Sequence, residues 1–83
     1  MAESVQAYLL MEIEIGKLDS VVEHLRKIPQ ATKVAVTTGG YDIVVLLEVS
    51  SLLELYEITV HNIHTISGIK ETETAVVEKM MTV

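Results

Sequence analysis

The middle of the chain decides the fold, because residues 31–47 read ATKVAVTTGGYDIVVLL. The β-branched run over residues 31–38 predicts one strand, and the dipeptide Gly39-Gly40 is a turn signal before a second strand over residues 41–49. That second strand contains the stretch from Ile43 to Leu47, which is apolar without polar alternation. Such a run indicates burial on both faces, and therefore a central place in the sheet.

Upstream of this hairpin the hydrophobic period changes once. Residues 4–15 alternate between two sets of side chains, which is the period of a strand. Residues 17–28 then place apolar side chains at helical spacing with charged residues opposite. Pro29 ends this pattern, because proline cannot continue a helix. A strand and then a helix are therefore expected before the central hairpin.

Downstream of the hairpin, a helix and a strand follow. Ser51 with Glu54 three residues later is a capping-box pattern that begins a helix, and the helical pattern runs to about Ile63. Residues 69–82 have the pattern of a last strand. The order β-α-β-β-α-β predicts an α+β fold of the ferredoxin-like type, in which an antiparallel sheet carries both helices on one face.

The second face of that sheet is expected to be apolar, although an uncovered sheet face is normally polar. We expect eight side chains on it: Tyr8, Leu10, Val34, Val36, Val44, Leu46, Val76 and Met80. An apolar patch of this size marks an interface. The simplest solution packs two sheets face to face across a two-fold axis, as a dimeric α+β barrel. A homodimer is the smallest assembly that we expect.

The composition agrees with a small domain that needs a partner. The 83 residues are expected to form one domain, residues 1–83, and 49% of them are hydrophobic, with a mean hydropathy of +0.41. Without cysteine there is no disulfide to support so short a chain. The longest apolar run is too short to span a bilayer, and no basic stretch precedes it as in a signal peptide. We expect a cytoplasmic protein without membrane contact.

The charge argues against direct binding of nucleic acid. The formal net charge is −6, with six Lys and Arg residues against twelve Asp and Glu residues. Proteins that bind DNA neutralise phosphates with clustered Lys and Arg side chains. Such a cluster is not evident in this sequence, so we expect no affinity of the chain itself for DNA.

No motif in the sequence supports catalysis, a metal or a cofactor. Glu57, His61 and His64 share one stripe of the second predicted helix, which is how a metal site can begin. The alternative is a solvated polar face with histidines near a helix C-terminus, and we favour it. The serines have capping or turn explanations, and neither a nucleophile elbow nor a phosphate-binding glycine motif occurs. Carboxylates two residues apart, such as Glu71 and Glu73, are expected to line a solvated strip.

The segment from Thr37 to Asp42 is the one polar, glycine-containing loop with ligand-binding chemistry. Glycine lets a ligand approach the backbone closely, and its N–H groups can meet a carboxylate. The carboxylate of Asp42 can accept a hydrogen bond from an ammonium group. The alternative is an ordinary hairpin turn in which Asp42 only supplies turn chemistry.

These residues resemble a known family. The order of elements, the motif Gly39-x-Tyr41-Asp42 before an apolar strand, and Thr72-Glu73-Thr74 followed by residues 75–79 are similar to the effector-binding domain of the Lrp/AsnC, or feast/famine, transcription regulators. This domain is also called the RAM domain. The resemblance implies dimers formed by sheet packing, dimers assembled into an octamer-like ring, and an amino-acid effector bound between dimers.

Carried over by position, the resemblance implies a ligand site at the loop and at the start of the last strand. The candidate residues are Gly39, Gly40, Tyr41, Asp42, Thr72 and Thr74. Gly40 departs from the family pattern, because many relatives have an acidic residue there. DNA-binding members also carry an N-terminal helix-turn-helix domain. This chain begins at its first strand, so it resembles a stand-alone version.

Three functions are therefore open as alternatives. The first is an amino-acid sensor that assembles with itself or with full-length relatives of the family. The second is a small dimeric enzyme of the monooxygenase or isomerase type, which rests on an analogy of fold alone. The third is a structural oligomerisation domain without a ligand.

Overall fold

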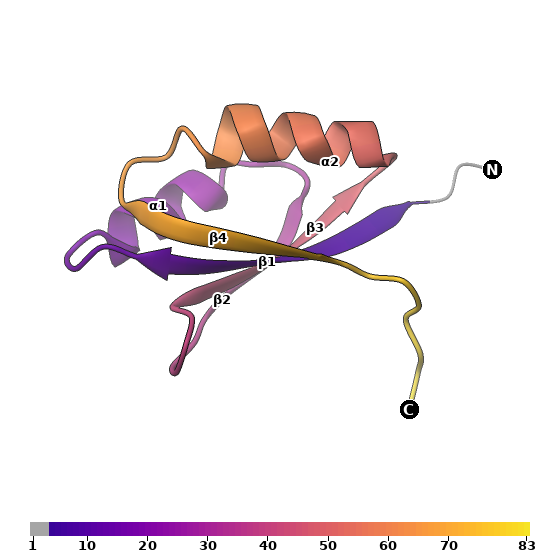
Figure 1. Ribbon diagram of the computed structural model, residues 1–83, viewed down its shortest axis with the longest axis horizontal. Helices are drawn as coiled ribbons and strands as arrows, with labels where there is room; N and C mark the ends of the chain where they lie inside the picture. Colours follow the sequence, from indigo (N-terminus) through magenta and orange to yellow (C-terminus); the bar gives the residue numbers. More distant parts are fainter. Residues whose placement is uncertain (1–3) are drawn as a thin grey trace.

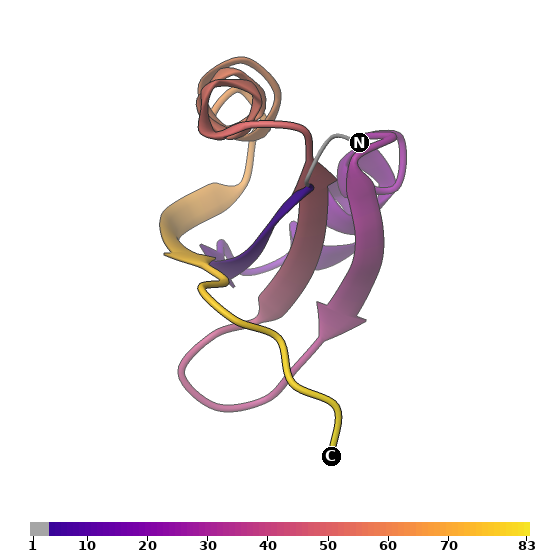
Figure 2. The same cartoon turned by 90° about the vertical axis from the view of Figure 1, so that its right-hand side faces the viewer.

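Four strands and two helices follow one another in the order that the sequence predicts (Figure 1). The computed structural model describes residues 4–83. Its elements are β1 (Val5–Ile13), α1 (Leu18–Leu25), β2 (Ala31–Val36), β3 (Ile43–Val49), α2 (Leu52–Ile58), a π-helical turn η1 (Thr59–Ile63) that continues α2, and β4 (Ile69–Val76). The sheet is antiparallel and both helices lie on the same face of it, as Figure 2 shows.

The strands are arranged in the order β2-β3-β1-β4, so β3 and β1 occupy the centre of the sheet. This confirms the prediction that the apolar run of β3 is central. β1 is paired with β3 through Leu9 opposite Val45 and Leu10 opposite Val44. β2 and β4 form the two edges.

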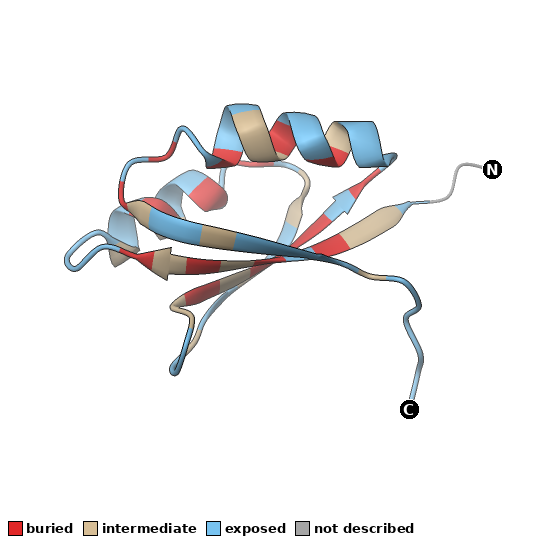
Figure 3. Cartoon of the chain, viewed as in Figure 1, coloured by how far each residue is buried: buried red, intermediate tan, exposed pale blue. Residues whose placement is uncertain are grey.

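The core lies between the sheet and the two helices (Figure 3). In β1 the alternation works as expected, because Ala7, Leu9 and Met11 are fully buried while the residues between them are not. The helices contribute buried side chains at helical spacing, including Val21 and Leu25. No helix in residues 4–83 combines the length and the apolar character needed to cross a bilayer.

Only one of the two hydrogen bonds of a capping box forms at the start of α2. The Ser51 hydroxyl accepts a hydrogen bond from the N–H of Glu54 at 3.1 Å. The Glu54 carboxylate instead accepts from the Ser50 N–H at 2.6 Å and from the Ser50 hydroxyl at 2.8 Å. These two bonds, together with the Gln30 side-chain amide, hold the pKa of Glu54 below its ordinary value. Gln30 thereby ties the start of β2 to the start of α2.

The pairing of the strands shows that three of the residues predicted for the open face of the sheet point to its other face. Val34 lies opposite Val45 and Val36 lies opposite Ile43, so both valines of β2 point to the helix-covered side. Val76 lies opposite the buried Ala7 and points the same way. The prediction that Val34, Val36 and Val76 share the open face is therefore wrong. Side chains in β2 and β4 do alternate between the two faces of the sheet. Which set points to which face depends on how β2 pairs with β3 and how β4 pairs with β1.

Irregular pairing explains why the phase could not be predicted. Between β2 and β3 the register shifts between Ala31 and Lys33. Between β1 and β4 it shifts at Glu12 and Ile13, so that Lys70 is the extra residue of β4 at a bulge. An extra residue reverses the faces of everything beyond it relative to a regular ladder. Local sequence does not reveal such shifts.

The open face carries a smaller apolar patch than predicted. It holds Tyr8, Leu10, Val44 and Leu46 in the centre, with Lys33 and Ala35 from β2 and Glu73 and Ala75 from β4 at the sides. Leu46 is only 8% exposed, yet it does not belong to the core cluster under the helices. Met80 lies beyond the end of β4, which stops at Val76 rather than at the predicted residue 82.

Candidate functional site

The loop between β2 and β3 is closed by hydrogen bonds of Thr37. Its N–H donates to the carbonyl of Asp42 at 2.9 Å, and its hydroxyl donates to the carbonyl of Tyr41 at 2.9 Å. Gly39 has a φ of +104°, a region that favours glycine, whereas Gly40 has no positive φ. A Cβ atom at either glycine would meet nothing within 4 Å. The backbone of this loop is therefore open to an approaching molecule.

Asp42 joins this loop to the end of β1. Its N–H donates to the carbonyl of Met11 at 2.8 Å. Its carboxylate atom Oδ2 accepts from the N–H of Ile13 at 2.8 Å in a partly buried position. One carboxylate oxygen thus serves the backbone, and the other, Oδ1, is the atom that a ligand could use.

Tyr41 connects the loop to β4. Its hydroxyl donates a hydrogen bond to the carboxylate of Glu73. That bond, followed by partial desolvation and by the negative charges of Glu73, Glu12 and Glu71, raises the pKa of Tyr41 above its ordinary value. The loop and the edge strand are thereby held together on the open face of the sheet.

The two threonines lie at the same end of the sheet but on its other face. Thr72 is opposite Met11, the residue whose carbonyl also accepts from the N–H of Asp42. Thr74 is opposite Leu9, so both threonines point to the helix-covered side of β4. Glu73 between them points to the open face. The structure therefore brings the loop to Glu73, and the six predicted residues surround one sheet end from two sides.

Carboxylates gather beside Tyr41. Glu12 lies directly opposite Glu71 on the neighbouring strand, and Glu73 follows on the same face. Like charges that face each other across two strands destabilise the sheet. A cationic group placed between them would relieve this repulsion. The sequence predicts only a solvated strip for these glutamates, although their spacing of two residues already places them on one face.

A small cleft borders β4 on the helix-covered side. Its volume is about 190 Å³, and it is lined by His64, Ile69, Lys70, Glu71 and Thr72. Lys70 is the bulged residue of β4 described above. An ammonium, an imidazole and a hydroxyl can all donate to a carboxylate. The sequence alone does not single out Lys70, because the bulge at this residue arises from the pairing of β4 with β1. It also does not show that His64 lies beside this end of the sheet.

The candidate site falls inside a match to a known protein family. The model of the Lrp/AsnC ligand binding domain matches residues 6–81. The chain belongs to this family. The fold and the family resemblance that the sequence predicts are thereby confirmed.

Curated relatives of this Lrp/AsnC domain are transcription regulators of archaea. One HTH-type transcriptional regulator of Pyrococcus horikoshii is 34% identical over 70 residues, which is 84% of this chain and 44% of the relative. The HTH-type transcriptional regulator FL11 of the same organism is 34% identical over 76 residues, covering 92% of this chain and 50% of the relative. The chain thus spans about half the length of the curated relatives it matches.

Solved structures with the same fold include both short and long proteins. FFRP-DM1 superposes with a TM-score of 0.84 at 30% identity, over 88% of this chain and 97% of that one. AsnC of E. coli superposes with a TM-score of 0.87 at 25% identity, over 95% of this chain and 56% of that one. The fold of this Lrp/AsnC domain therefore occurs in chains of different lengths.

The side chains of Glu57, His61 and His64 are exposed on the second helical segment, α2 and η1, and at its C-cap. His61 Nε2 lies 3.5 Å from the Glu57 carboxylate, and both side chains are largely exposed. Within residues 4–83, no three His, Cys, Asp or Glu side chains are placed to hold a metal ion. The stripe of Glu57, His61 and His64 is a solvated helix face with one exposed contact.

Proposed function

We propose that this Lrp/AsnC domain binds a small amino acid as an effector where the β2–β3 loop meets β4. The observation that supports this most directly is the hydrogen bond from Tyr41 to Glu73, because it joins the two predicted halves of the site. The family match supports a ligand-binding rather than a catalytic role. The ligand is held by the loop on one side and by β4 on the other.

The chemistry of the site suits a zwitterion. An ammonium group would lie near Oδ1 of Asp42 and near the facing pair Glu12 and Glu71, where it offsets their repulsion. A carboxylate group would accept hydrogen bonds from the open backbone at Gly39 and Gly40. Selectivity among amino acids would come from whichever apolar or polar groups meet the ligand side chain.

The same proposal includes assembly into a homo-oligomer. Tyr8, Leu10, Val44 and Leu46 leave an apolar centre on the open face, and a second sheet packed on it would remove that surface from water. A two-fold axis makes such a contact self-complementary. Dimers would further associate into an octamer-like ring, with the ligand between dimers. The same surfaces would allow association with full-length Lrp/AsnC regulators.

A structural oligomerisation domain without a ligand is the second candidate. It is favoured by the bond between Asp42 Oδ2 and the N–H of Ile13, because this bond gives Asp42 a role in the fold that needs no ligand. In that case the only role of the Asp42 carboxylate is to accept the hydrogen bond from Ile13 at the end of the sheet. The two candidates differ in whether any amino acid changes stability or assembly.

Titration calorimetry with light scattering on the same samples tests the proposal. A thermal-shift screen of the twenty amino acids first selects a ligand, since binding to the folded state alone raises its melting temperature. We expect saturable heat and a change in assembly size for at least one amino acid. The matched variants are Glu73→Gln, which changes the site, and Glu57→Gln, which lies on the exposed face of α2. Absence of binding by all amino acids, with a normally folded and assembled protein, leaves the structural role as the function.

A further inference from the structure

A groove of about 250 Å³ lies between the C-terminal ends of α1 and η1. Two buried isoleucines, Ile28 and Ile66, give it an apolar floor, while its polar side chains are exposed. One of its walls follows η1, a π-helical turn, and such single turns often occur at functional sites. The groove is separate from the candidate site described above, because neither the β2–β3 loop nor β4 lines it.

The rim of this groove is rich in groups that donate hydrogen bonds. Lys27 contributes an ammonium group and Asn62 an amide with two N–H donors. An imidazole ring comes from each side, His24 from α1 and His61 from η1. Among the described residues, no Asp or Glu lines the groove, although the chain has twelve of them against six Lys and Arg. The rim therefore suits an anion and offers no carboxylate to an ammonium group.

The carbonyl groups at these helix ends are already hydrogen-bonded. Unpaired carbonyls give a helix C-terminus a partial negative charge, which disfavours an anion. At the end of α1 the carbonyls of His24 and Leu25 accept from N–H groups three residues further on, at 3.2 and 3.1 Å. At the end of η1 the carbonyl of His61 accepts from the hydroxyl of Thr65 at 3.0 Å. These bonds offset part of the negative charge beside the groove.

The ring of His24 is held by a bond to its own helix. Its Nδ1 lies 2.8 Å from the carbonyl oxygen of Ser20. Because a carbonyl oxygen only accepts, Nδ1 is the nitrogen that carries the proton. The other nitrogen, Nε2, then has a lone pair in the neutral ring and an N–H in the charged ring. His24 therefore has a donor left for an anion only when it is protonated.

The other charged groups near the rim differ between the two sides. His61 Nε2 lies 3.5 Å from the carboxylate of Glu57 on α2, which competes with an anion for this ring. On α1, Lys27 lines the groove, whereas its neighbour Arg26 contacts Glu23 at 3.4 Å. We therefore expect His24 and Lys27 to supply most of the attraction for an anion.

We propose that this groove binds a small apolar carboxylate that has no amino group. The carboxylate oxygens accept hydrogen bonds from Lys27 and Asn62, and from His24 when its ring is protonated. The apolar part of the ligand covers the isoleucine floor. The ligand class differs from the amino acid proposed above, since the rim has no acceptor for an ammonium group.

Nuclear magnetic resonance of the full chain tests this site, because each backbone N–H reports on its own surroundings. Benzoate is the probe, titrated at about pH 5.5 and at about pH 8, between which histidine loses its charge. We expect saturable shifts of the Lys27, His61 and Asn62 signals. The dissociation constant should be about 10-fold lower at the lower pH, because a charged hydrogen bond is gained. Benzamide, which has the same ring without the charge, is the control ligand.

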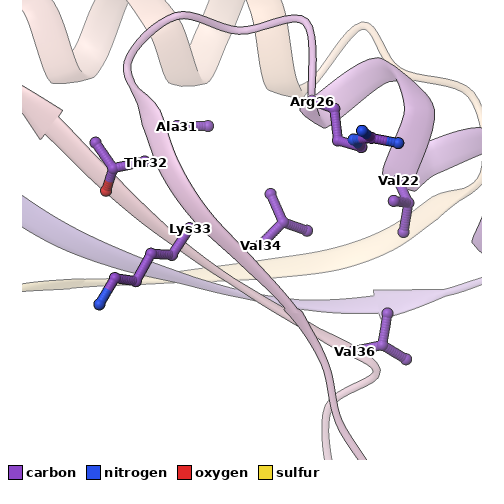
Figure 4. Close-up of a pocket in the computed structure, with 7 residues that line it drawn as sticks. All are labelled: Val22, Arg26, Ala31, Thr32, Lys33, Val34 and Val36. Atoms are coloured by element: carbon purple, nitrogen blue, oxygen red, sulfur yellow. The ribbon is translucent and has the colours of Figure 1, made fainter.

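Lys27→Gln and Arg26→Gln form a matched pair of variants. Each removes one positive charge at the end of α1, but Arg26 lines a different groove, between α1 and β2 (Figure 4). We expect Lys27→Gln to weaken benzoate binding by about 5- to 10-fold. Arg26→Gln should change it by less than about twofold, since an exposed charge outside the groove acts weakly. Thermal unfolding checks that both variants fold.

His24→Gln and His64→Gln test the pH dependence. We expect His24→Gln to bind benzoate at the lower pH as weakly as the parent does at the higher pH. His64 lines the other cleft, beside Lys70, so its substitution should leave the pH dependence unchanged. Binding by the parent that does not differ between the two pH values overturns the role of His24.

Three further results would overturn the site itself. Equal weakening by Lys27→Gln and Arg26→Gln would show attraction to the charge of the helix end in general. Equal binding of benzoate and benzamide would show an apolar site without an anion. The third result is no saturable shift at the groove with benzoate at either pH. The effector proposal is tested separately, by amino-acid titration and Glu73→Gln, so it can stand or fall independently of this groove.

Discussion

Asp42 and Ile13 are joined by a 2.8 Å hydrogen bond from the N–H of Ile13 to the carboxylate of Asp42. The residue proposed to meet a ligand ammonium therefore also closes the pairing of β1 and β3. A substitution at Asp42 acts on stability and on binding at once, and the two effects have to be measured separately.

We predict that Asp42→Ala and Asp42→Asn differ in stability but not in binding. Alanine leaves the Ile13 N–H without its acceptor, which costs about 1–3 kcal/mol of unfolding free energy. Asparagine keeps an acceptor oxygen, so the Asp42→Asn variant loses less unfolding free energy. Both variants lose the negative charge that would attract an ammonium group. Urea unfolding and calorimetry with the selected amino acid measure the two quantities. Undiminished binding by a folded Asp42→Asn variant would place the ligand elsewhere.

We predict that Leu46→Lys dissociates the dimer or unfolds the chain. Leu46 is 8% exposed on the open face, where a second sheet would cover it. Because Leu46 is already almost covered within one chain, the main effect is that an unpaired ammonium group at the apolar centre of the open face would have to be buried beneath the second sheet, which is strongly unfavourable. Sedimentation reports the change. Glu57→Lys on the exposed face of α2 is the control, and a parent protein that is monomeric at micromolar concentration contradicts the interface.

We predict that Tyr41 ionises at higher pH than an ordinary tyrosine and that Glu73→Gln removes most of the difference. The hydrogen bond and the charge of Glu73 favour the protonated phenol, so the pKa of Tyr41 is raised in the folded state. Its contribution to stability is therefore present below the unfolded tyrosine pKa of about 10 and is lost as pH rises through the higher folded value. Ultraviolet absorbance above pH 9 follows the titration, and Tyr41→Phe assigns it. The same curve for the parent and Glu73→Gln would argue against the contact.

We predict no measurable affinity of this chain for duplex DNA. Its net charge of −6 repels phosphates, and its six Lys and Arg residues are spread over the sequence. A gel-shift assay at low salt is the most sensitive check. Salt-dependent binding in that assay would show a basic surface that the charge distribution does not suggest.

The order of elements and the core could be predicted from the sequence because they depend on local periods. The alternation of β1, the helical spacing before Pro29 and the uninterrupted run from Ile43 to Leu47 all express burial that each segment shows by itself. The turn at Gly39 is also predictable, because its backbone conformation favours glycine.

The faces of the edge strands and the composition of the site could not be predicted in this way. Alternation alone puts Val34 and Val76 on the wrong side, because the register of β2 and β4 contains shifts. The contact between Tyr41 and Glu73 is equally hidden, since it joins residues 32 positions apart in the sequence. The spacing of Thr72 and Thr74 predicts that they share a face, but which face depends on how β4 pairs with β1.

The bulge at Lys70 has a consequence for how relatives of this domain can vary in length. Lys70 is the unpaired residue between the pairs Glu12–Glu71 and Ile13–Ile69, so Thr72 to Val76 pair with β1 on the far side of it. A homologue that lacks one residue here would restore a regular ladder without moving those threonines or the glutamate between them. Gaps in an alignment are therefore expected at this position, and the insertion or deletion would alter the connection to α2 while sparing the part of β4 that carries Thr72, Glu73 and Thr74.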